Sequence, residues 1–274
     1  MDQPPVSPQT RRRKPLNLTA IKSGIVFCVA LVTAVGSALS GLGAQVAFAP
    51  MLTWMLGFAA DKALATALRY AAFTAFAAVV GAFVAKVTPT AFVQRGLLLV
   101  IAATAGAILA APFSVKPGMV AQRRLFQSLG VLLTLFTIVH TARLTAWDVP
   151  HFAVWNSSLA LAGLGFVVGA LTQVMGLASG TLLIPALTFL AAFKAKEAVA
   201  LSLLVVALAS ALPAWSYARR GLADATYGNW AVLGGIVGGF AGGLLLAKVT
   251  DSFVLLFFAV IAMFLCGREL ARMA

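Results

Sequence analysis

The chain has 274 residues, of which 62% are hydrophobic and 10% charged, and its formal net charge is +13. Its mean hydropathy is +1.01, and soluble domains carry about 25% charged residues, so the composition excludes an ordinary soluble protein. Several apolar runs reach the ~20 residues that a helix needs to cross a bilayer. They lack the alternation of barrel strands, so we predict an all-α, polytopic transmembrane helical bundle.

The basic residues gather mainly at the ends of the apolar runs and in the N-terminal segment. Residues 1–18 are interpreted as a flexible basic tail, with the densest cluster at Arg11, Arg12, Arg13 and Lys14. Because Lys and Arg concentrate in cytoplasmic segments, their distribution favours a cytoplasmic N-terminus. The positive charge therefore indicates membrane topology, and we expect no nucleic-acid partner.

Five apolar segments are expected in each half of the chain. The first half, residues 19–146, contains the segments 20–40, 44–57, 62–85, 95–113 and 124–145. The second half, residues 147–274, contains the segments 153–175, 180–192, 197–217, 228–248 and 252–272. The bundle is therefore expected to hold eight to ten membrane segments.

The two halves also share a sequence pattern, which predicts two homologous repeats. A single offset of 135 positions separates Gly41 from Gly176, Pro50 from Pro185 and Thr53 from Thr188. In both copies a small-residue turn precedes a short apolar segment that contains a proline. Paired, interrupted hydrophobic segments of this kind are the sequence signature of a transporter's binding site.

The short segments 44–57 and 180–192 are predicted to be broken or re-entrant helices. Each is shorter than a full span, and its proline removes an intrahelical donor and favours a break or kink. Irregular backbone at membrane depth is tolerated where it is buried in protein or lines a cavity. Whether these segments cross the bilayer is left open, which separates the eight-segment arrangement from the ten-segment one.

At the repeated break the sequence resembles the sulfite exporter TauE/SafE family of membrane permeases. The resembling features are the small-residue turn, the proline nine residues after its first glycine, and the Ala-rich helix that follows and bears Thr66 or Ser202. The resemblance spans about residues 20–272. It implies movement of sulfite, organosulfonates and related small anions across the inner membrane. The family's turn is richer in glycine, so the substrate class rests on the resemblance alone.

The breaks themselves could bind an anion. The N-terminus of a half-helix offers free N–H groups and about half a positive charge, and glycine allows a close approach of the ligand. The alternative is that these glycines only permit a tight turn between helices. The candidate substrate-binding residues at the breaks are Gly41, Gly43, Ala44, Gln45, Pro50, Gly176, Ser179, Gly180, Thr181 and Pro185.

Four residues outside the breaks complete the candidate site. Arg69 lies inside an apolar segment, and its guanidinium could pair with two oxygens of a sulfonate; snorkelling or a structural bond is the alternative. Thr66 and Ser202 lie on the helices after the breaks, where bonding to the i−4 carbonyl is the commoner role. Gln173 precedes the second break and could line the same cavity.

The favoured function is a secondary transporter or permease of small sulfur-containing anions, acting as an exporter. The alternatives are a non-transporting membrane scaffold or assembly factor, and a permease for an unrelated small organic anion. No nucleophile–base pair, paired acids, metal-ligand cluster or P-loop is recognisable, so we expect no enzyme, no metal and no cofactor. The expected partners are the small anionic substrate and the lipid bilayer, and a homo-oligomer is left open.

Overall fold

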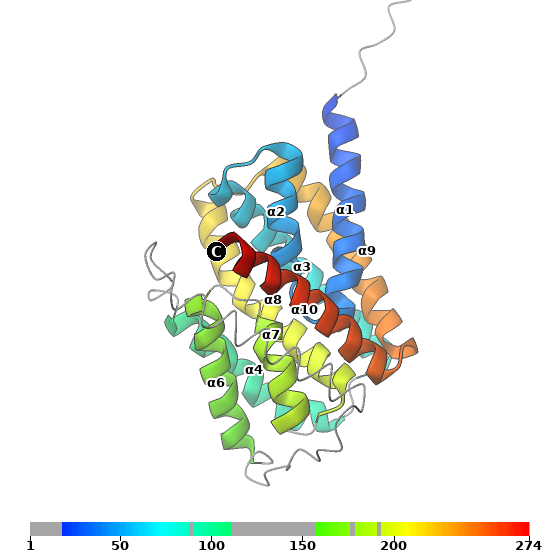
Figure 1. The fold of residues 1–274 in the computed structure, drawn as a ribbon, viewed down its shortest axis with the longest axis vertical. Coiled ribbons are helices and arrows are strands. Elements are labelled where there is room, and N and C mark those ends of the chain that lie inside the picture. The colour runs from blue at the N-terminus through cyan, green and yellow to red at the C-terminus, as the bar shows by residue number, and fades with distance from the viewer. Residues whose placement is uncertain (1–17, 88–89, 111–156, 176–178, 191–192, 274) are drawn as a thin grey trace, which may run out of the picture.

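The structure, a computed structural model, describes residues 18–87, 90–110, 157–175, 179–190 and 193–273 (Figure 1). These residues contain helices and no strands, which confirms the all-α prediction. The helices are α1 (Leu18–Ser40), α2 (Gln45–Leu56), α3 (Ala60–Val84), α4 (Thr90–Ala110), α6 (Ser158–Met175), α7 (Ser179–Pro185), the π-helix η3 (Ala186–Leu190), α8 (Ala195–Arg219), α9 (Ala225–Lys248) and α10 (Asp251–Met273).

Four helices in the described part of the chain are long and apolar enough to cross a membrane, and they lie in α1, α3, α8 and α9. Shorter apolar helices span Gln45–Leu56, Gly96–Ala110, Ser158–Leu171 and Asp251–Phe264. The chain is therefore a multi-pass, helical membrane protein. The predicted segment 124–145 and the boundary between residues 146 and 147 lie outside the described residues.

The two short segments adopt different structures. α2 has 12 residues and continues through Pro50 without interruption. α7 ends after 7 residues at Pro185, and the chain continues as the 5-residue π-helix η3. In η3 the Thr188 hydroxyl donates to the Ile184 carbonyl at 2.9 Å and approaches the Pro185 carbonyl at 3.2 Å. The break expected at the proline therefore occurs only in the second half.

A glycine-rich helix holds α1 and α3 together. In α9 one stripe, Gly234, Gly238 and Gly242, packs on α1, and a second stripe, Gly235, Gly239 and Gly243, packs on α3. A Cβ on a residue of the first stripe would overlap α1, and one on the second stripe would overlap α3. The spacing of four in each stripe is the pattern by which small residues allow close helix packing. α4 and α6 meet in the same way, with Gly165 against Leu99 and Gly169 against Ala103.

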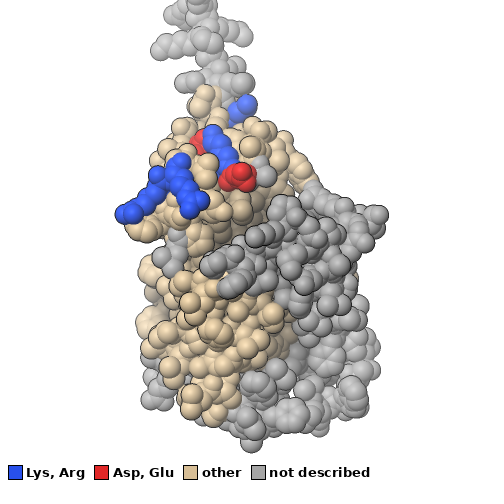
Figure 2. Space-filling model, turned by 90° about the vertical axis from the view of Figure 1, so that its left-hand side faces the viewer, with Lys and Arg blue, Asp and Glu red and all other residues tan. Residues whose placement is uncertain are grey.

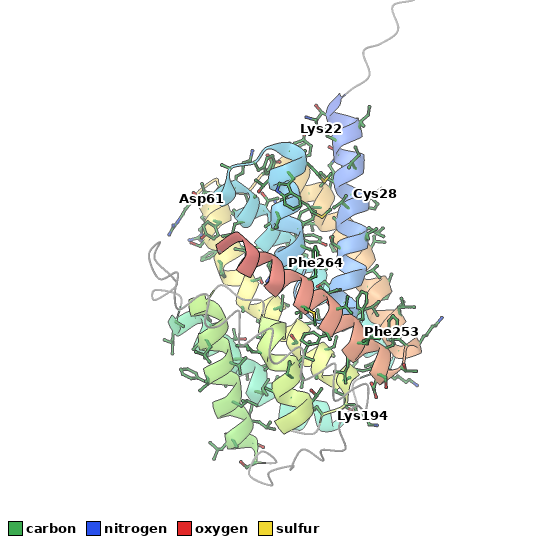
Figure 3. All side chains as sticks on the ribbon, viewed as in Figure 1. Lys22, Cys28, Asp61, Lys194, Phe253 and Phe264 are labelled. Atoms are coloured by element: carbon green, nitrogen blue, oxygen red, sulfur yellow. The ribbon has the colours of Figure 1, made fainter. Side chains whose placement is uncertain are left out.

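Charged side chains of the described residues lie toward the ends of the bundle. Lys22 and Asp61 lie in its upper part and Lys194 lies at the opposite end (Figure 3). Figure 2 shows the charged residues of one face gathered near the upper end, above an uncharged tan surface. This separation suits a bundle whose middle faces hydrocarbon, because charge at membrane depth is costly.

Candidate functional site

The first break joins the end of α1 to the start of α2. Gly41 and Gly43 have φ values of 68° and 82°, a left-handed conformation that glycine adopts at little cost. The Gly41 N–H donates to the Ser37 carbonyl at 2.7 Å and closes the last turn of α1. The turn is buried, since Leu42 is 2% and Ala44 3% exposed. These two glycines therefore allow the chain to reverse inside the protein.

α2 begins at Gln45, one residue after the start of the predicted segment 44–57, and its first turn lacks a side-chain cap. The N-cap residue is Ala44, which has no side chain that could accept from the first N–H groups. Free N–H groups at a helix start carry partial positive charge and normally find a capping side chain, water or a ligand. The Val46 N–H donates to the Gly43 carbonyl at 3.4 Å, and residues 45–47 are partly buried. The start of α2, which has no side-chain cap, is thus a partly buried position that favours a hydrogen-bond acceptor.

The second break lies against the first. Residues 176–178, including the predicted site residue Gly176, lie outside the described residues. Gly180 in α7 packs on Gly41 so closely that a Cβ would overlap the Gly41 carbonyl oxygen and lie 2.9 Å from the carbonyl carbon. The same Gly41 is contacted by Ile184 of α7 and Val199 of α8. Segments about 140 residues apart in sequence therefore meet at one point.

Ser202 anchors the junction of the two breaks. It is fully buried in α8, and its hydroxyl donates to the Gly41 carbonyl at 2.8 Å. This carbonyl is freed when α1 ends, so the serine satisfies an acceptor that would otherwise be unpaired. Ser202 does not bond to its own i−4 carbonyl in this arrangement. Its hydroxyl links the second half of the chain to the break in the first half.

Two buried side-chain oxygens at the first break have no hydrogen-bond partner in the described structure: Ser37 Oγ and Gln45 Oε1. They belong to α1 and α2, the two helices that the first break joins. The Gln45 amide folds back toward Gly43, at the start of α2. Because an unpaired buried polar group costs roughly 1–3 kcal/mol, such a concentration indicates groups that await a ligand or water.

A tyrosine that sequence reasoning missed organises the same region. Tyr70 of α3 is fully buried; its hydroxyl donates to the Ala30 carbonyl at 2.8 Å and lies 2.8 Å from Thr33 Oγ1. Its ring lies 4.2 Å from the ring of Phe48 in α2. Tyr70 therefore fixes α1, α2 and α3 around the break. Polar pairs four apart, Thr33 with Ser37 and Tyr70 with Thr74, were the available signal.

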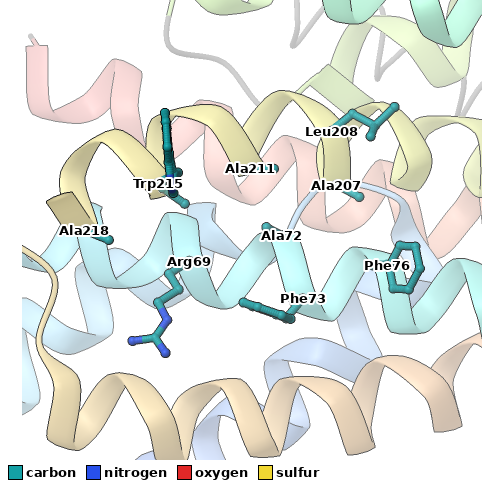
Figure 4. A pocket seen from close by; sticks show the side chains of 10 residues that line it. Arg69, Ala72, Phe73, Phe76, Ala207, Leu208, Ala211, Trp215 and Ala218 are labelled. Carbon is teal, nitrogen blue, oxygen red and sulfur yellow. The ribbon is translucent and has the colours of Figure 1, made fainter.

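Thr66 and Arg69 face α9 and the turn before it. The Thr66 hydroxyl donates to the Lys62 carbonyl at 2.8 Å and accepts from the Asp224 N–H at 3.1 Å. Arg69 donates to Asn229 Oδ1 at 2.9 Å, and Figure 4 shows its side chain directed toward α9. The described structure thus engages both side chains in links between helices. It shows no bond from either residue to the first break.

Arg69 also borders a groove between α3 and α8. The groove has a volume of about 500 Å³, and its other lining residues are apolar or aromatic, including Phe73, Phe76 and Trp215. Arg219 stacks on the Trp215 ring, with 3.6 Å between the guanidinium carbon and the ring centroid. In a membrane-spanning bundle such an apolar groove faces lipid, and the guanidinium of Arg69 points away from it (Figure 4).

The turn before α9 is held to α3 by charge. Lys62 Nζ lies 2.7 Å from Asp224 Oδ2, and Asp224 Oδ1 caps α9 by accepting from the Tyr227 N–H at 2.8 Å. Burial opposes ionisation of Asp224, but the bonds from Lys62 and from the Tyr227 and Thr226 N–H groups lower its pKa overall. Asp224 is therefore a charged tether at neutral pH.

For the remaining candidates, the structure gives the helix and the turn in which each residue lies. Gln173 lies in the last turns of α6, before the second break, and Ser179 and Thr181 lie in the first turn of α7. Asp61 and Glu197 fall in the first turns of α3 and α8, where the helix dipole favours a negative charge. No group of three or more potential metal ligands occurs within the residues that the structure describes.

Comparison with known proteins supports the resemblance drawn from the sequence. Residues 161–274 match the family described as Sulfite exporter TauE/SafE. Two relatives from Xylella fastidiosa, strains 9a5c and Temecula1, are each named "Probable membrane transporter protein" and are 26% identical over 161 residues. The match covers 58% of this chain and 60% of each relative, which is less than two thirds of their length. No solved structure matches the chain. Over residues 161–274, the chain is therefore similar in sequence to the sulfite exporter TauE/SafE family.

Proposed function

We propose that this chain is a membrane transporter that exports small sulfur-containing oxyanions of the sulfite or organosulfonate class. The observation that carries the proposal is the junction of the two helix breaks, where an uncapped helix start and unpaired buried oxygens lie inside the bundle. The names of the relatives and the matched family favour transport as the activity. The sulfur-containing substrate rests on the family resemblance.

The chemistry of the first break suits an oxyanion. The N–H groups at the start of α2 would donate to its oxygens, and the helix dipole would favour its negative charge. Ser37 carries a hydroxyl without a described partner, and it could donate one further bond. The Gln45 amide contributes donors from the same turn. A desolvated site of this kind binds an anion through several directed bonds rather than through a single ion pair.

The predicted site residues have different roles in this proposal. Gly41, Gly43, Ala44 and Gln45 form the anion-binding turn, and Pro50 belongs to the helix whose N-terminus supplies the dipole. On the other side of the junction, Gly176, Ser179, Gly180, Thr181 and Pro185 form the second break, with Gln173 before it.

The three remaining residues act through contacts between helices. Ser202 positions the first break through its bond to Gly41. Thr66 and Arg69 hold α3 against α9, and their effect on transport would come through this helix contact.

The membrane potential supplies a driving force for the export of an anion. We place the chain in the inner membrane with a cytoplasmic N-terminus and with the two repeats as residues 19–146 and 147–274. Movement of an anion out of a negative-inside cell is favoured by about 2.3 kcal/mol per charge per 100 mV. An exporter of monovalent anions therefore needs no coupling ion, and its rate rises as the membrane potential becomes more negative inside.

Alanine and leucine variants of the first break test this proposal. Ser37→Ala and Gln45→Leu remove unpaired polar groups, and we expect each to weaken sulfite or organosulfonate flux while the protein stays folded, because no described partner is lost. Thr104→Ala is the matched control, since that hydroxyl bonds only within α4, at 2.8 Å from the Val100 carbonyl. Equal flux in all three variants would show that the first break takes no part in transport.

A further inference from the structure

A second pocket lies at the end of the bundle opposite Lys22. It has a volume of about 380 Å³ and is formed where α3 ends, α8 begins and α9 turns into α10. Its charged lining residues are Lys86, Lys194, Lys196, Glu197 and Asp251. Figure 3 places Lys194 at the lower end of the bundle, far from Lys22 and Asp61. This pocket is separate from the junction of the breaks and from the groove that borders Arg69.

The charges in the pocket are not balanced by one another. Asp251 accepts from the Lys196 backbone N–H at 3.4 Å, and Lys196 Nζ donates to the Ala247 carbonyl at 3.1 Å. By contrast, no ion pair or hydrogen bond joins the ammonium group of Lys86 or Lys194 to any residue that the structure describes. Three lysines line the pocket together with two carboxylates, those of Glu197 and Asp251. The Asp251 carboxylate already accepts a hydrogen bond from the backbone at the start of α8. The pocket therefore retains free positive charge.

Lys86 occupies a position where lysine is unfavourable. Its φ is 56°, and no other non-glycine residue of the described structure has a positive φ. It follows the C-cap of α3 in a Schellman turn, with Lys86 N–H to the Phe83 carbonyl and Val87 N–H to the Ala82 carbonyl, each 3.0 Å. Glycine is the usual residue at this position because it has no Cβ. A lysine that adopts a strained left-handed conformation at the wall of a pocket indicates that its ammonium group takes part in binding there.

From the pocket and its unpaired lysines, we infer that it binds a small tetrahedral oxyanion: a free sulfate- or phosphate-like ion, or the phosphate of an anionic lipid headgroup. Lys86 and Lys194 supply the charge, and α8 starts at the same wall without a side-chain cap from Lys194. Lysine binds such groups as a point charge, so two ammonium groups in the lining of an open pocket can hold the anion. The negative charge of Glu197 repels the anion and lowers the affinity of the pocket for it.

Binding of inorganic sulfate to the purified full chain in detergent, measured by calorimetry, tests the inference. We expect saturable binding that weakens about tenfold in Lys86→Gln or Lys194→Gln, which corresponds to ~1.4 kcal/mol for one charge-assisted contact. Glu197→Gln should strengthen binding, because it removes a like charge. Lys248→Gln is the matched control: this neighbouring lysine is exposed at the end of α9 and does not line the pocket.

Two further measurements identify the source of the oxyanion and separate binding from folding. Native mass spectrometry compares retention of phosphatidylglycerol with that of phosphatidylcholine: selective retention that is lost in the double variant of Lys86 and Lys194 identifies a lipid headgroup. Lys86→Gly should leave the thermal midpoint unchanged or higher, because it relieves the positive φ, and should still weaken anion binding. Absence of both saturable sulfate binding and selective lipid retention in the folded wild type would overturn the inference.

Discussion

Replacing Gly180 with alanine tests whether the two breaks are packed as the structure describes. The new Cβ would overlap the Gly41 carbonyl oxygen and lie 2.9 Å from its carbonyl carbon, whereas ordinary contact begins at 3.4 Å. Because the obstacle is backbone, α7 or the first break must retreat by at least about 0.5 Å, and such overpacking typically costs about 1–3 kcal/mol. The shift would also stretch the 2.8 Å bond from Ser202 to Gly41.

The assay compares Gly180→Ala with Gly163→Ala, because a Cβ on Gly163 meets nothing within 4 Å. Thermal unfolding in detergent and anion flux in proteoliposomes are measured for both. We expect a lower midpoint and reduced flux for Gly180→Ala. Gly163→Ala should match the wild type or exceed it by roughly 0.5–1 kcal/mol, since alanine favours a helix interior. Equal stability and flux in the two variants would refute the packing of α7 on the first break.

Three further predictions concern single bonds. Ser202→Ala loses the buried bond to Gly41, and we expect a stability loss of about 1 kcal/mol together with reduced flux, measured beside Thr104→Ala, whose bond stays within α4. Arg69→Gln is expected to abolish transport at normal membrane abundance, because it removes the charged link from α3 to Asn229; normal flux would remove Arg69 from the transport machinery. Asp224 has a lowered pKa, so the stability from its pairing with Lys62 is fully present above its ordinary pKa and is lost as pH falls through the folded value. Thermal midpoints between pH 6 and about pH 3 should therefore fall less in Asp224→Asn than in the wild type, and parallel curves would contradict this tether.

The sequence alone was sufficient to predict the membrane bundle and the positions of the breaks. Long apolar runs and paired small-residue turns depend only on local chain chemistry, so the starts of α2 at Gln45 and α7 at Ser179 agree with the predicted ranges. In α9 each glycine stripe repeats every four residues, a local pattern that favours close helix packing.

What the sequence did not predict are contacts between distant segments. The bond from Ser202 to Gly41 joins residues 161 positions apart, and neither residue indicates its partner. In the sequence, Tyr70 looks like an ordinary aromatic residue of an apolar helix. Its role depends on contacts with Ala30 of α1 and Phe48 of α2, which only the fold shows. Arg69 was interpreted as a residue of the site, and the fold directs it to Asn229 instead of the breaks. Lys86 became notable only through its backbone conformation.

Flux of labelled anions in proteoliposomes that contain the purified full chain is the most direct test of the central claim. The panel is sulfite, an organosulfonate, sulfate and a simple carboxylate, each with and without an imposed membrane potential. The account predicts saturable movement of a sulfur oxyanion that is driven by the potential and weakened in Gln45→Leu. No flux of any anion from folded protein, or flux unchanged in that variant, would contradict the claim that the junction of the breaks is a transport site.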